Sequence, residues 1–226
     1  MRDVIIACDF QNKIETRKFL ANFKNELPFL KIGMELFYKE GPKFVKELKD
    51  EGFKIFLDLK LHDIPNTVHK AMINIGKLGV DITNLHAAGG IKMMKAALSG
   101  LRESNKDCKL IAVTQLTSID NQTLKDELLI TKSINDTVKH YALNAKKAGL
   151  DGVVCSPLEA PIISEMGLIS VTPGIRFKDG STDDQARIST PSDAKKLGST
   201  YIVVGRAITK APNVIEAYQK CIKEFV

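Results

Sequence analysis

The stretch Val4-Ile-Ile-Ala-Cys-Asp-Phe-Gln-Asn12 joins a short, β-branched apolar run to a turn that contains no glycine. A run such as Val4–Cys8, bounded by polar residues, predicts a strand that is buried on both faces, as in parallel sheets. An open, doubly wound sheet has about five or six strands and usually a glycine-rich first turn. Because Cys8–Asn12 carries no glycine, the sequence favours a closed barrel over an open sheet.

The alternation of a short apolar run with a longer helical segment continues along the whole chain. The further strands that we expect are Phe29–Gly33, Lys54–Asp58, Asp81–Leu85, Leu110–Thr114, Gly152–Cys155, Leu168–Val171 and Tyr201–Val204. Several intervening segments end in a glycine suited to a left-handed conformation, namely Gly52, Gly79, Gly149, Gly167 and Gly198. Eight strand–helix units predict an α/β fold, a single (β/α)8 TIM barrel that occupies residues 1–226 as one domain.

The composition excludes several classes of protein. The chain has 226 residues, of which 44% are hydrophobic, and a formal net charge of +6. No apolar run approaches the roughly 20 residues of a membrane span, and Asp3 and Asp9 enclose the first run too closely for a secretory signal. Four scattered cysteines without a metal-ligand spacing predict reduced thiols in a cytoplasmic protein. The sequence has no basic run and no Trp, so we expect neither a nucleic-acid nor a membrane partner.

Two connections are longer than the others. Residues 115–132 include a segment, Leu124–Leu129, for which we expect a short helix, and residues 173–190 are polar and show neither period. Long irregular loops inside compact domains are usually lids or binding loops. Both connections follow predicted strands, so both should lie at the C-terminal end of the barrel, where barrel active sites are found.

Charged residues interrupt the apolar strands. In Phe56-Leu-Asp-Leu-Lys-Leu-His-Asp-Ile-Pro-Asn-Thr67, side chains alternate between faces, so Asp58 and Lys60 share one face. In a barrel that face meets the interior, where an unpaired charge costs several kcal/mol. Lys31 in the preceding strand and Asp63 directly after this one are within reach of the same place. An ordinary salt bridge between Asp58 and Lys60, with a snorkelling Lys31, is the alternative without a function.

Two ammonium groups and two carboxylates in a water-poor cavity hold one another in the charged state. A lysine that stays protonated beside carboxylates is a poor nucleophile, so this set of residues argues against a Schiff base. Such a lysine donates a proton readily, which favours the protonation of a carbanion.

The ten residues Asp58-Leu-Lys-Leu-His-Asp-Ile-Pro-Asn-Thr67 resemble the signature of the orotidine 5′-phosphate decarboxylase family, in its bacterial branch. Further segments agree with that family in order and position: Ala7–Asp9, Lys31, His86–Gly90, Val113–Ser118, Val171–Arg176, Asp184–Gln185 and Val204–Arg206. The ten-residue segment is highly specific, whereas each short segment is weak alone. Together they extend over nearly the whole chain.

The resemblance implies a cofactor-independent carboxy-lyase of pyrimidine biosynthesis, which converts orotidine 5′-monophosphate to UMP and CO2 without a metal ion. It assigns to Lys60 the donation of a proton to C6 of the pyrimidine. The implied catalytic array comprises Lys31, Asp58, Lys60 and Asp63. The implied assembly is a homodimer that shares Asp63, Ile64 and Thr67 across its interface.

The resemblance also implies contacts with each part of the nucleotide. It assigns the ribose hydroxyls to Asp9 and Lys31, and the base to Thr117. The implied residues of the 5′-phosphate region are Arg176, Gln185, Gly205 and Arg206. The rest of the implied substrate site is Asp58, Leu59, Lys60, Leu61, His62, Asp63, Ile64, Pro65, Asn66 and Thr67. We expect structural roles for His62 and His86.

The predicted fold independently supports the phosphate assignment. Loops after the seventh and eighth strands commonly form the phosphate site of a barrel. Gly205 permits close approach of the backbone, and Arg206 at a helix start presents a planar pair of donors to phosphate oxygens. A turn glycine followed by a solvated arginine is the alternative.

Two other functions stay open. A sugar-phosphate enzyme on the same barrel, such as keto-gulonate 6-phosphate decarboxylase or hexulose-phosphate synthase, shares the Asp-x-Lys-x-x-Asp pattern but stabilises an enediolate with Mg²⁺. The segments Ile64–Thr67 and Gln115–Ser118 favour the pyrimidine nucleotide. The second alternative is a nucleotide-binding barrel without catalytic activity, against which the intact charged array argues.

Overall fold

The computed structural model describes residues 2–24, 26–177 and 189–226. Within these residues, eight parallel strands close into a barrel in chain order, and β8 pairs with β1. The strands are β1 (Asp3–Ala7), β2 (Phe29–Gly33), β3 (Ile55–Leu61), β4 (Ile82–His86), β5 (Lys109–Val113), β6 (Gly152–Val154), β7 (Ile169–Thr172) and β8 (Tyr201–Val204). The closed barrel confirms the predicted TIM-barrel fold and excludes the open sheet. Every predicted strand is present, and β3 extends furthest beyond its predicted end.

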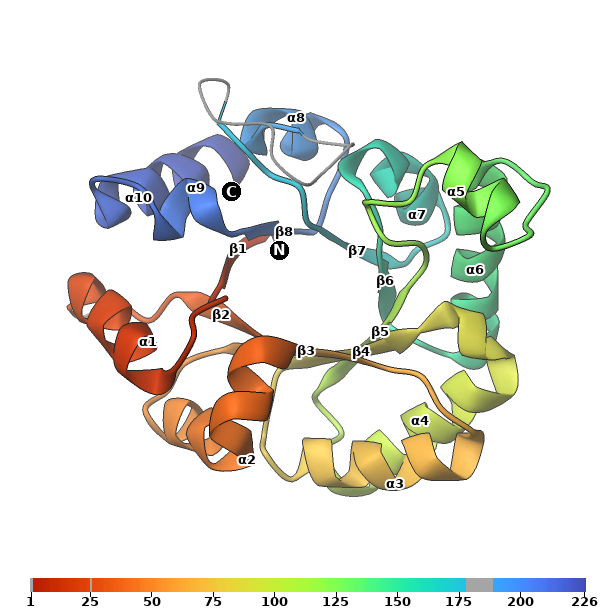
Figure 1. The fold of residues 1–226 in the computed structure, drawn as a ribbon, viewed down its shortest axis with the longest axis horizontal. Coiled ribbons are helices and arrows are strands. Elements are labelled where there is room, and N and C mark those ends of the chain that lie inside the picture. The colour runs from red at the N-terminus through yellow and green to blue at the C-terminus, as the bar shows by residue number, and fades with distance from the viewer. Residues whose placement is uncertain (1, 25, 178–188) are drawn as a thin grey trace.

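Helices surround the barrel (Figure 1). They are α1 (Lys13–Leu20), α2 (Met34–Asp50), α3 (Pro65–Gly76), α4 (Gly90–Ser104), α5 (Asn121–Asp126), α6 (Ile134–Ala148), α7 (Ala160–Glu165), α8 (Pro191–Lys196), α9 (Arg206–Thr209) and α10 (Val214–Phe225), with 3₁₀ helices η1 (Ala21–Phe23), η2 (Ala87–Gly89) and η3 (Pro157–Glu159). The glycines predicted to end helical segments all have positive φ. Side-chain caps fix several starts; Asn12, for example, accepts a hydrogen bond from the backbone N–H of Glu15.

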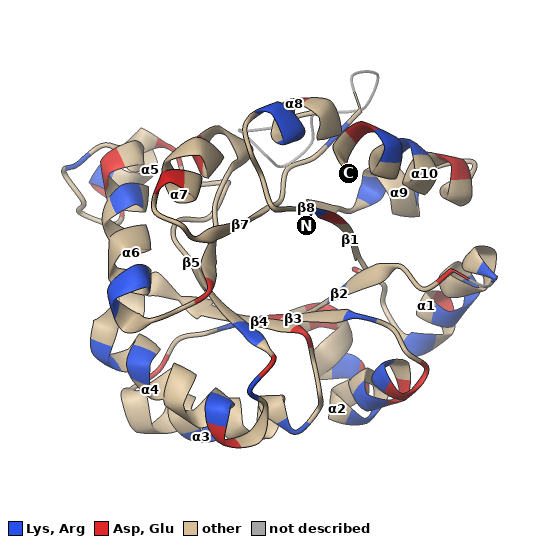
Figure 2. Cartoon of the chain, turned by 180° about the vertical axis from the view of Figure 1, so that it is seen from behind, with Lys and Arg blue, Asp and Glu red and all other residues tan. Residues whose placement is uncertain are grey.

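The strands are apolar on both faces. In β1, Ile5 and Ala7 enter a cluster inside the barrel, whereas Val4 and Ile6 enter a larger cluster between the strands and the helices. This double burial explains why the strands appear in the sequence as continuous apolar runs. Charged residues lie mainly on the outer helices and in the connections (Figure 2).

The connection that follows β5 contains a short helix, but its predicted bounds, Leu124–Leu129, are wrong. The helix is α5, which begins at Asn121 because the Asp120 side chain accepts a hydrogen bond from the backbone N–H of Thr123. Leu129 has a φ of 56°, so it lies outside a right-handed helix. Most of the second long connection, residues 178–188, lies outside the described residues.

The four cysteines are buried free thiols, as the sequence predicts. Burial raises the pKa of Cys8, Cys108 and Cys221 to about 12. In the part of the chain that the structure describes, no helix is both long enough and apolar enough to cross a membrane.

Replacing Gly100 by Ala should destabilise the protein, because a Cβ at this position of α4 would lie 2.2 Å from the carbonyl oxygen of His69 in α3. In an open helix position the same change stabilises by about 1 kcal/mol, but overpacking against backbone costs roughly 1–3 kcal/mol. We expect the free energy of unfolding in urea to fall by about 2 kcal/mol. Ser99→Ala, at an exposed position of α4, is the control and should show no loss. A Gly100→Ala protein as stable as the wild type would contradict this packing.

Candidate active site

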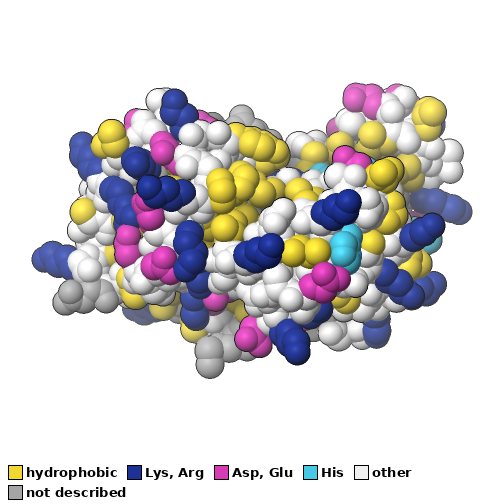
Figure 3. Space-filling view, turned by 90° about the horizontal axis from the view of Figure 1, so that it is seen from below, with side chains coloured by type: hydrophobic (Ala, Val, Ile, Leu, Met, Phe, Trp, Pro, Cys, Tyr) yellow, Lys and Arg dark blue, Asp and Glu magenta, His cyan; other side chains and the backbone are white. Residues whose placement is uncertain are grey.

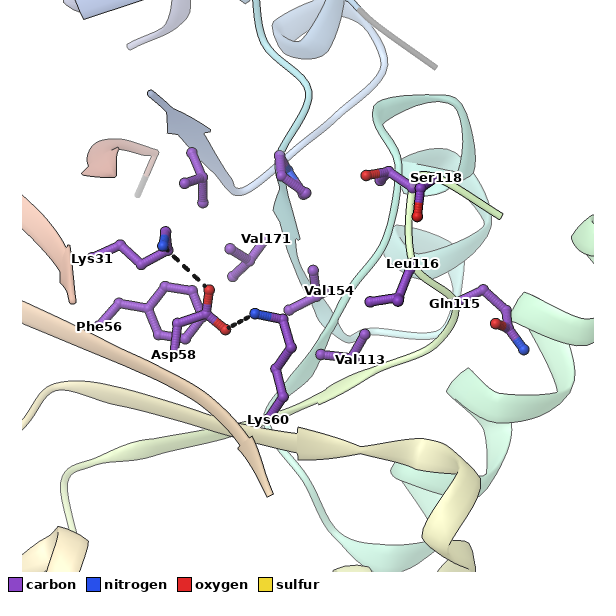
Figure 4. A pocket seen from close by; sticks show the side chains of 13 residues that line it. Lys31, Phe56, Asp58, Lys60, Val113, Gln115, Leu116, Ser118, Val154 and Val171 are labelled. Carbon is purple, nitrogen blue, oxygen red and sulfur yellow. Dashed lines mark hydrogen bonds and ion pairs between the residues drawn. The ribbon is translucent and has the colours of Figure 1, made fainter. Parts of the chain in front are cut away.

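A cavity of about 300 Å³ lies among the C-terminal ends of the strands and the connection after β5 (Figure 4). Its wall on the side of β2 and β3 is charged, with Lys31, Asp58 and Lys60. The other lining residues are Phe56, Val113, Gln115, Leu116, Thr117, Ser118, Val154, Val171, Pro173 and Val203. The cavity is therefore largely apolar, with its charges gathered on one side.

The Asp58 carboxylate lies between two ammonium groups (Figure 4). Lys60 Nζ is 2.7 Å from Asp58 Oδ1, and Lys31 Nζ is 3.5 Å from Asp58 Oδ2. Lys31 Nζ also donates to Asp9 Oδ1 at 2.9 Å. Asp58 and Lys31 are only 7% and 9% exposed. The structure thus brings together three members of the predicted array, Lys31, Asp58 and Lys60.

Opposing effects set the charge states in this cluster. Burial raises the pKa of Asp58, but Lys31, Lys60 and hydrogen bonds from Lys60 and Asn84 outweigh it, so the pKa lies below its usual value. Burial lowers the pKa of Lys31, but the Asp58 and Asp9 carboxylates outweigh it, so this pKa lies above its usual value. Both groups are therefore charged at neutral pH, as the sequence argument requires.

An irregular part of β3 places these side chains. The β3–β4 register runs from Leu57 opposite Thr83 to Leu61 opposite Leu85, so residues 58–60 face a single residue of β4. Lys60 has a φ of 51°, in the left-handed region that non-glycine residues seldom occupy. Regular alternation predicts correctly that Asp58 and Lys60 share a face, but it does not predict this bulge.

The sequence argument missed Asn84, the β4 residue opposite the bulge. Its side chain is fully buried and bonds to both Lys60 and Asp58. The signal was an amide side chain in the middle of the strand Ile82–His86, where a buried amide without a partner is costly.

The fourth predicted member of the array, Asp63, does not line the cavity in this chain. It is exposed, and its Oδ1 accepts a hydrogen bond of 2.6 Å from the backbone N–H of Ile64, just before α3. Ile64 is 67% exposed, and Asn66 and Thr67 on the first turn of α3 are also exposed.

Other predicted contact residues lie away from the cavity. Leu59 and Leu61 belong to the apolar cluster between the barrel and its helices. The ring of His62 lies 5.6 Å from that of His86. Burial, with smaller effects of His62 and Lys60, lowers the pKa of His86. Pro65 is the first residue of α3 and, like these four, is not part of the cavity lining.

A second cavity, of about 530 Å³, contains Asp9, Gly205 and Arg206 among its lining residues. Gly205 directly precedes α9, and Arg206 is its first residue, as predicted for the connection after β8. Arg176 follows β7, and its backbone N–H donates to the carbonyl of Ser189. Gln185, also expected near the phosphate, lies outside the described residues.

The closed parallel barrel and its surrounding helices define a (β/α)8 barrel. Its charged cavity lies at the carboxyl ends of the strands, where the active sites of barrel enzymes are found. The chain belongs to the orotidine 5′-phosphate decarboxylase / HUMPS family, whose sequence model matches residues 2–221.

Relatives agree with this family over nearly their full lengths. A Staphylococcus saprophyticus protein named orotidine 5′-phosphate decarboxylase is 57% identical over 223 residues, which cover 97% of this chain and 96% of that protein. A protein of the same name from Staphylococcus aureus (strain Newman) is 55% identical over 228 residues, 99% of this chain and 98% of that protein. The crystal structure of orotidine 5′-phosphate decarboxylase from Lactobacillus acidophilus has a TM-score of 0.90 and 42% identity, and it covers 100% of this chain and 99% of that chain.

Replacing Asp58 by Asn should destabilise the fold, because it leaves the Lys31 and Lys60 ammonium groups facing each other without the carboxylate between them. Breaking a buried ion pair costs on the order of 3 kcal/mol, which urea unfolding at about pH 7 should show. Asp50→Asn, which removes the partner of Lys46 in an exposed pair, is the control and should change stability by less than about 0.5 kcal/mol.

The Asp58→Asn effect should also depend on pH with a definite sign. Because the folded state lowers the pKa of Asp58, its contribution is complete above the unfolded pKa of about 3.9. That contribution is lost as the pH falls through the lower folded value. The stability gap between the two proteins should therefore be steady above about pH 5 and shrink below about pH 4. A gap that grows on acidification would contradict the assigned charge state.

Proposed function

We propose that this protein decarboxylates orotidine 5′-monophosphate to UMP and CO2, with residues 1–226 acting as one catalytic domain. The observation that carries the proposal is the Lys31–Asp58–Lys60 cluster on one wall of an otherwise largely apolar cavity. The names of the relatives at 55% and 57% identity support the same reaction.

The chemistry assigned to Lys60 follows from its position. When the bond between C6 and the carboxylate breaks, CO2 leaves and the electron pair stays on C6. A preorganised ammonium beside that carbon stabilises the developing charge, and the apolar walls strengthen the interaction. The new C6–H bond takes its proton from Lys60 Nζ, which solvent later reprotonates. The 2.7 Å hydrogen bond to Asp58 orients the ammonium.

We assign the nucleotide to both cavities, which the contact between Lys31 and Asp9 links. In the proposed complex the base lies against Thr117, and the ribose hydroxyls bind Asp9 and Lys31, which contact each other. The phosphate binds at Gly205 and Arg206 at the start of α9, where helix N–H groups favour an anion. Arg176 and Gln185 complete the phosphate region in the same proposal.

We propose further that the array is completed by Asp63 from a second copy of the chain, with Ile64 and Thr67 at the same interface. Figure 3 shows hydrophobic side chains gathered on the side of the molecule where α2 and α3 lie. Met34 and Tyr38 on α2 are 43% and 76% exposed, and Ile64 lies just before α3. Such exposed apolar residues support a self-association surface at the mouth of the barrel.

When the protein is incubated with orotidine 5′-monophosphate in EDTA, the absorbance of orotidylate should fall. The amount of CO2 released should equal the amount of orotidylate lost. Lys60→Ala should lower kcat by at least about 10³-fold, because it removes both the cation and the proton donor. Lys139→Ala, on the exposed face of α6, is the control and should retain full activity. Activity that disappears in EDTA and returns with Mg²⁺ would indicate enediolate chemistry instead. Binding of UMP without any turnover would indicate a nucleotide-binding barrel, and either result overturns the proposal.

Mixing inactive Lys60→Ala and Asp63→Ala proteins should restore activity if the sites are shared. After random subunit exchange, half of the dimers are mixed and each has one intact site, so about a quarter of the wild-type activity is expected. Lys60→Ala mixed with Asp58→Asn is the control, since both residues act from one chain and no site is repaired. No recovery despite demonstrated exchange would show that Asp63 is not shared.

A further inference from the structure

The bulge in β3 leaves the backbone of Lys60 outside the regular strand ladder. Residues 58–60 face only Asn84 between the register pairs Leu57–Thr83 and Leu61–Leu85. Lys60 also has a positive φ, and its backbone N–H donates to a side-chain oxygen, Asn84 Oδ1, at this irregular part of the pairing. A half-buried backbone donor that leaves the strand ladder needs another partner.

Asn84 supplies that partner and more. Its Oδ1 accepts from the backbone N–H of Lys60 at 2.8 Å, and its Nδ2 donates to Asp58 Oδ1 at 2.7 Å. Lys60 Nζ donates to the same carboxylate oxygen at 2.7 Å. These hydrogen bonds link the backbone of Lys60, the amide of Asn84, the carboxylate of Asp58 and the ammonium of Lys60 into one closed ring.

To close this ring, the side chain at position 84 must carry both an acceptor for the Lys60 N–H and a donor for the Asp58 carboxylate. A carboxylate at position 84 accepts from Lys60 but presents an oxygen to Asp58, and an alkyl side chain does neither. Asn84 has no exposed surface and is absent from the lining of the cavity. Its contribution therefore acts through Lys60 and Asp58 and not through contact with a nucleotide.

We propose that Asn84 is a positioning residue that holds the Lys60 ammonium and the Asp58 carboxylate in their reactive arrangement before substrate arrives. As a statement about catalysis, this inference rests on the proposed function. Misplacement of a reacting group by about 1 Å is enough to lower a rate by about 10²-fold.

The test compares Asn84→Asp and Asn84→Ala with Thr83→Val. Thr83 is the matched control, because it is equally buried on β4 and its hydroxyl also bonds to β3, at the carbonyl of Leu57, away from the charged cluster. Both Asn84 variants should lose about 10²-fold in kcat while the Kd for UMP changes less than about threefold. Thr83→Val should lose thermal stability but keep kcat. If Asn84→Ala does not fold, the isosteric Asn84→Asp decides.

A second measurement needs no turnover. The ¹³C signal of the Asp58 carboxyl, titrated without nucleotide, should show a higher pKa in both Asn84 variants, since each removes a hydrogen bond to the charged form. In Asn84→Ala the titratable groups facing Asp58 are unchanged, with Lys31 from β2, Lys60 from β3 and His86 nearby on β4, whereas Asn84→Asp adds a carboxylate that raises the pKa of Asp58 further.

The outcomes separate the two proposals. If the wild type does not convert orotidine 5′-monophosphate, the proposed function fails, and the Asp58 titration alone decides whether Asn84 positions the cluster. If the wild type is active, kcat within threefold of it in Asn84→Asp overturns the inference. An equal loss of kcat in Thr83→Val overturns it as well. Such a result would mean that losing any buried hydrogen bond between β3 and β4 lowers kcat, whether or not the bond holds the charged cluster.

Discussion

The Asp58 carboxylate, held between the ammonium groups of Lys31 and Lys60, is the interaction on which the rest of the site depends. Each of these charges is costly in the interior of a barrel unless a group of opposite charge lies beside it. Their meeting is a consequence of strand order, because β2 pairs with β3 in a register that sets Lys31 opposite Phe56. Lys31 then reaches Asp58 two residues further along the neighbouring strand. This diagonal contact lies toward the C-terminal ends of the barrel strands, beside the cavity.

Stability alone does not explain this cluster. Buried ion pairs are often replaceable by apolar residues of similar volume without loss of stability, and the surrounding Phe56, Val171 and Val203 already form an apolar cluster inside the barrel. In addition, the pairing of β3 with β4 is irregular at residues 58–60, and Lys60 has an unfavourable backbone conformation. Local irregularity of this kind is typical of positions where function opposes regular packing. This irregularity supports the proposal that the cluster is preorganised charge for a reaction with developing negative charge.

The sequence was informative wherever the relevant signal is local. Strand periodicity predicted every strand of the barrel, and the charged residues inside apolar strands predicted the meeting of Lys31, Asp58 and Lys60. The bulge was not predictable in the same way, because it depends on the pairing of β3 with β4, and alternation within one strand does not report that pairing. Asn84 was missed for the same reason, since its importance appears only when Lys60 leaves the ladder. The bounds of α5 depended on one capping residue, Asp120. The proposed role of Asp63 involves a second chain, and the pattern within one chain does not report such a contact.

Lys31 connects the two cavities, and this gives the site a physical means of coupling its parts. It lines the charged cavity, while its partner Asp9 lines the cavity that contains Gly205 and Arg206. The Asp9 side chain is 58% exposed, whereas that of Asp58 is only 10% exposed. The Lys31 ammonium therefore contacts one solvent-exposed carboxylate and one buried carboxylate. In the proposed complex, a ribose hydroxyl bound to Asp9 competes with Lys31 for that carboxylate and leaves more of the positive charge of Lys31 to Asp58. The same proposal therefore routes binding energy gained away from the reacting carbon to the charged array through a single side chain, and binding energy used in this way raises a rate and not only an affinity.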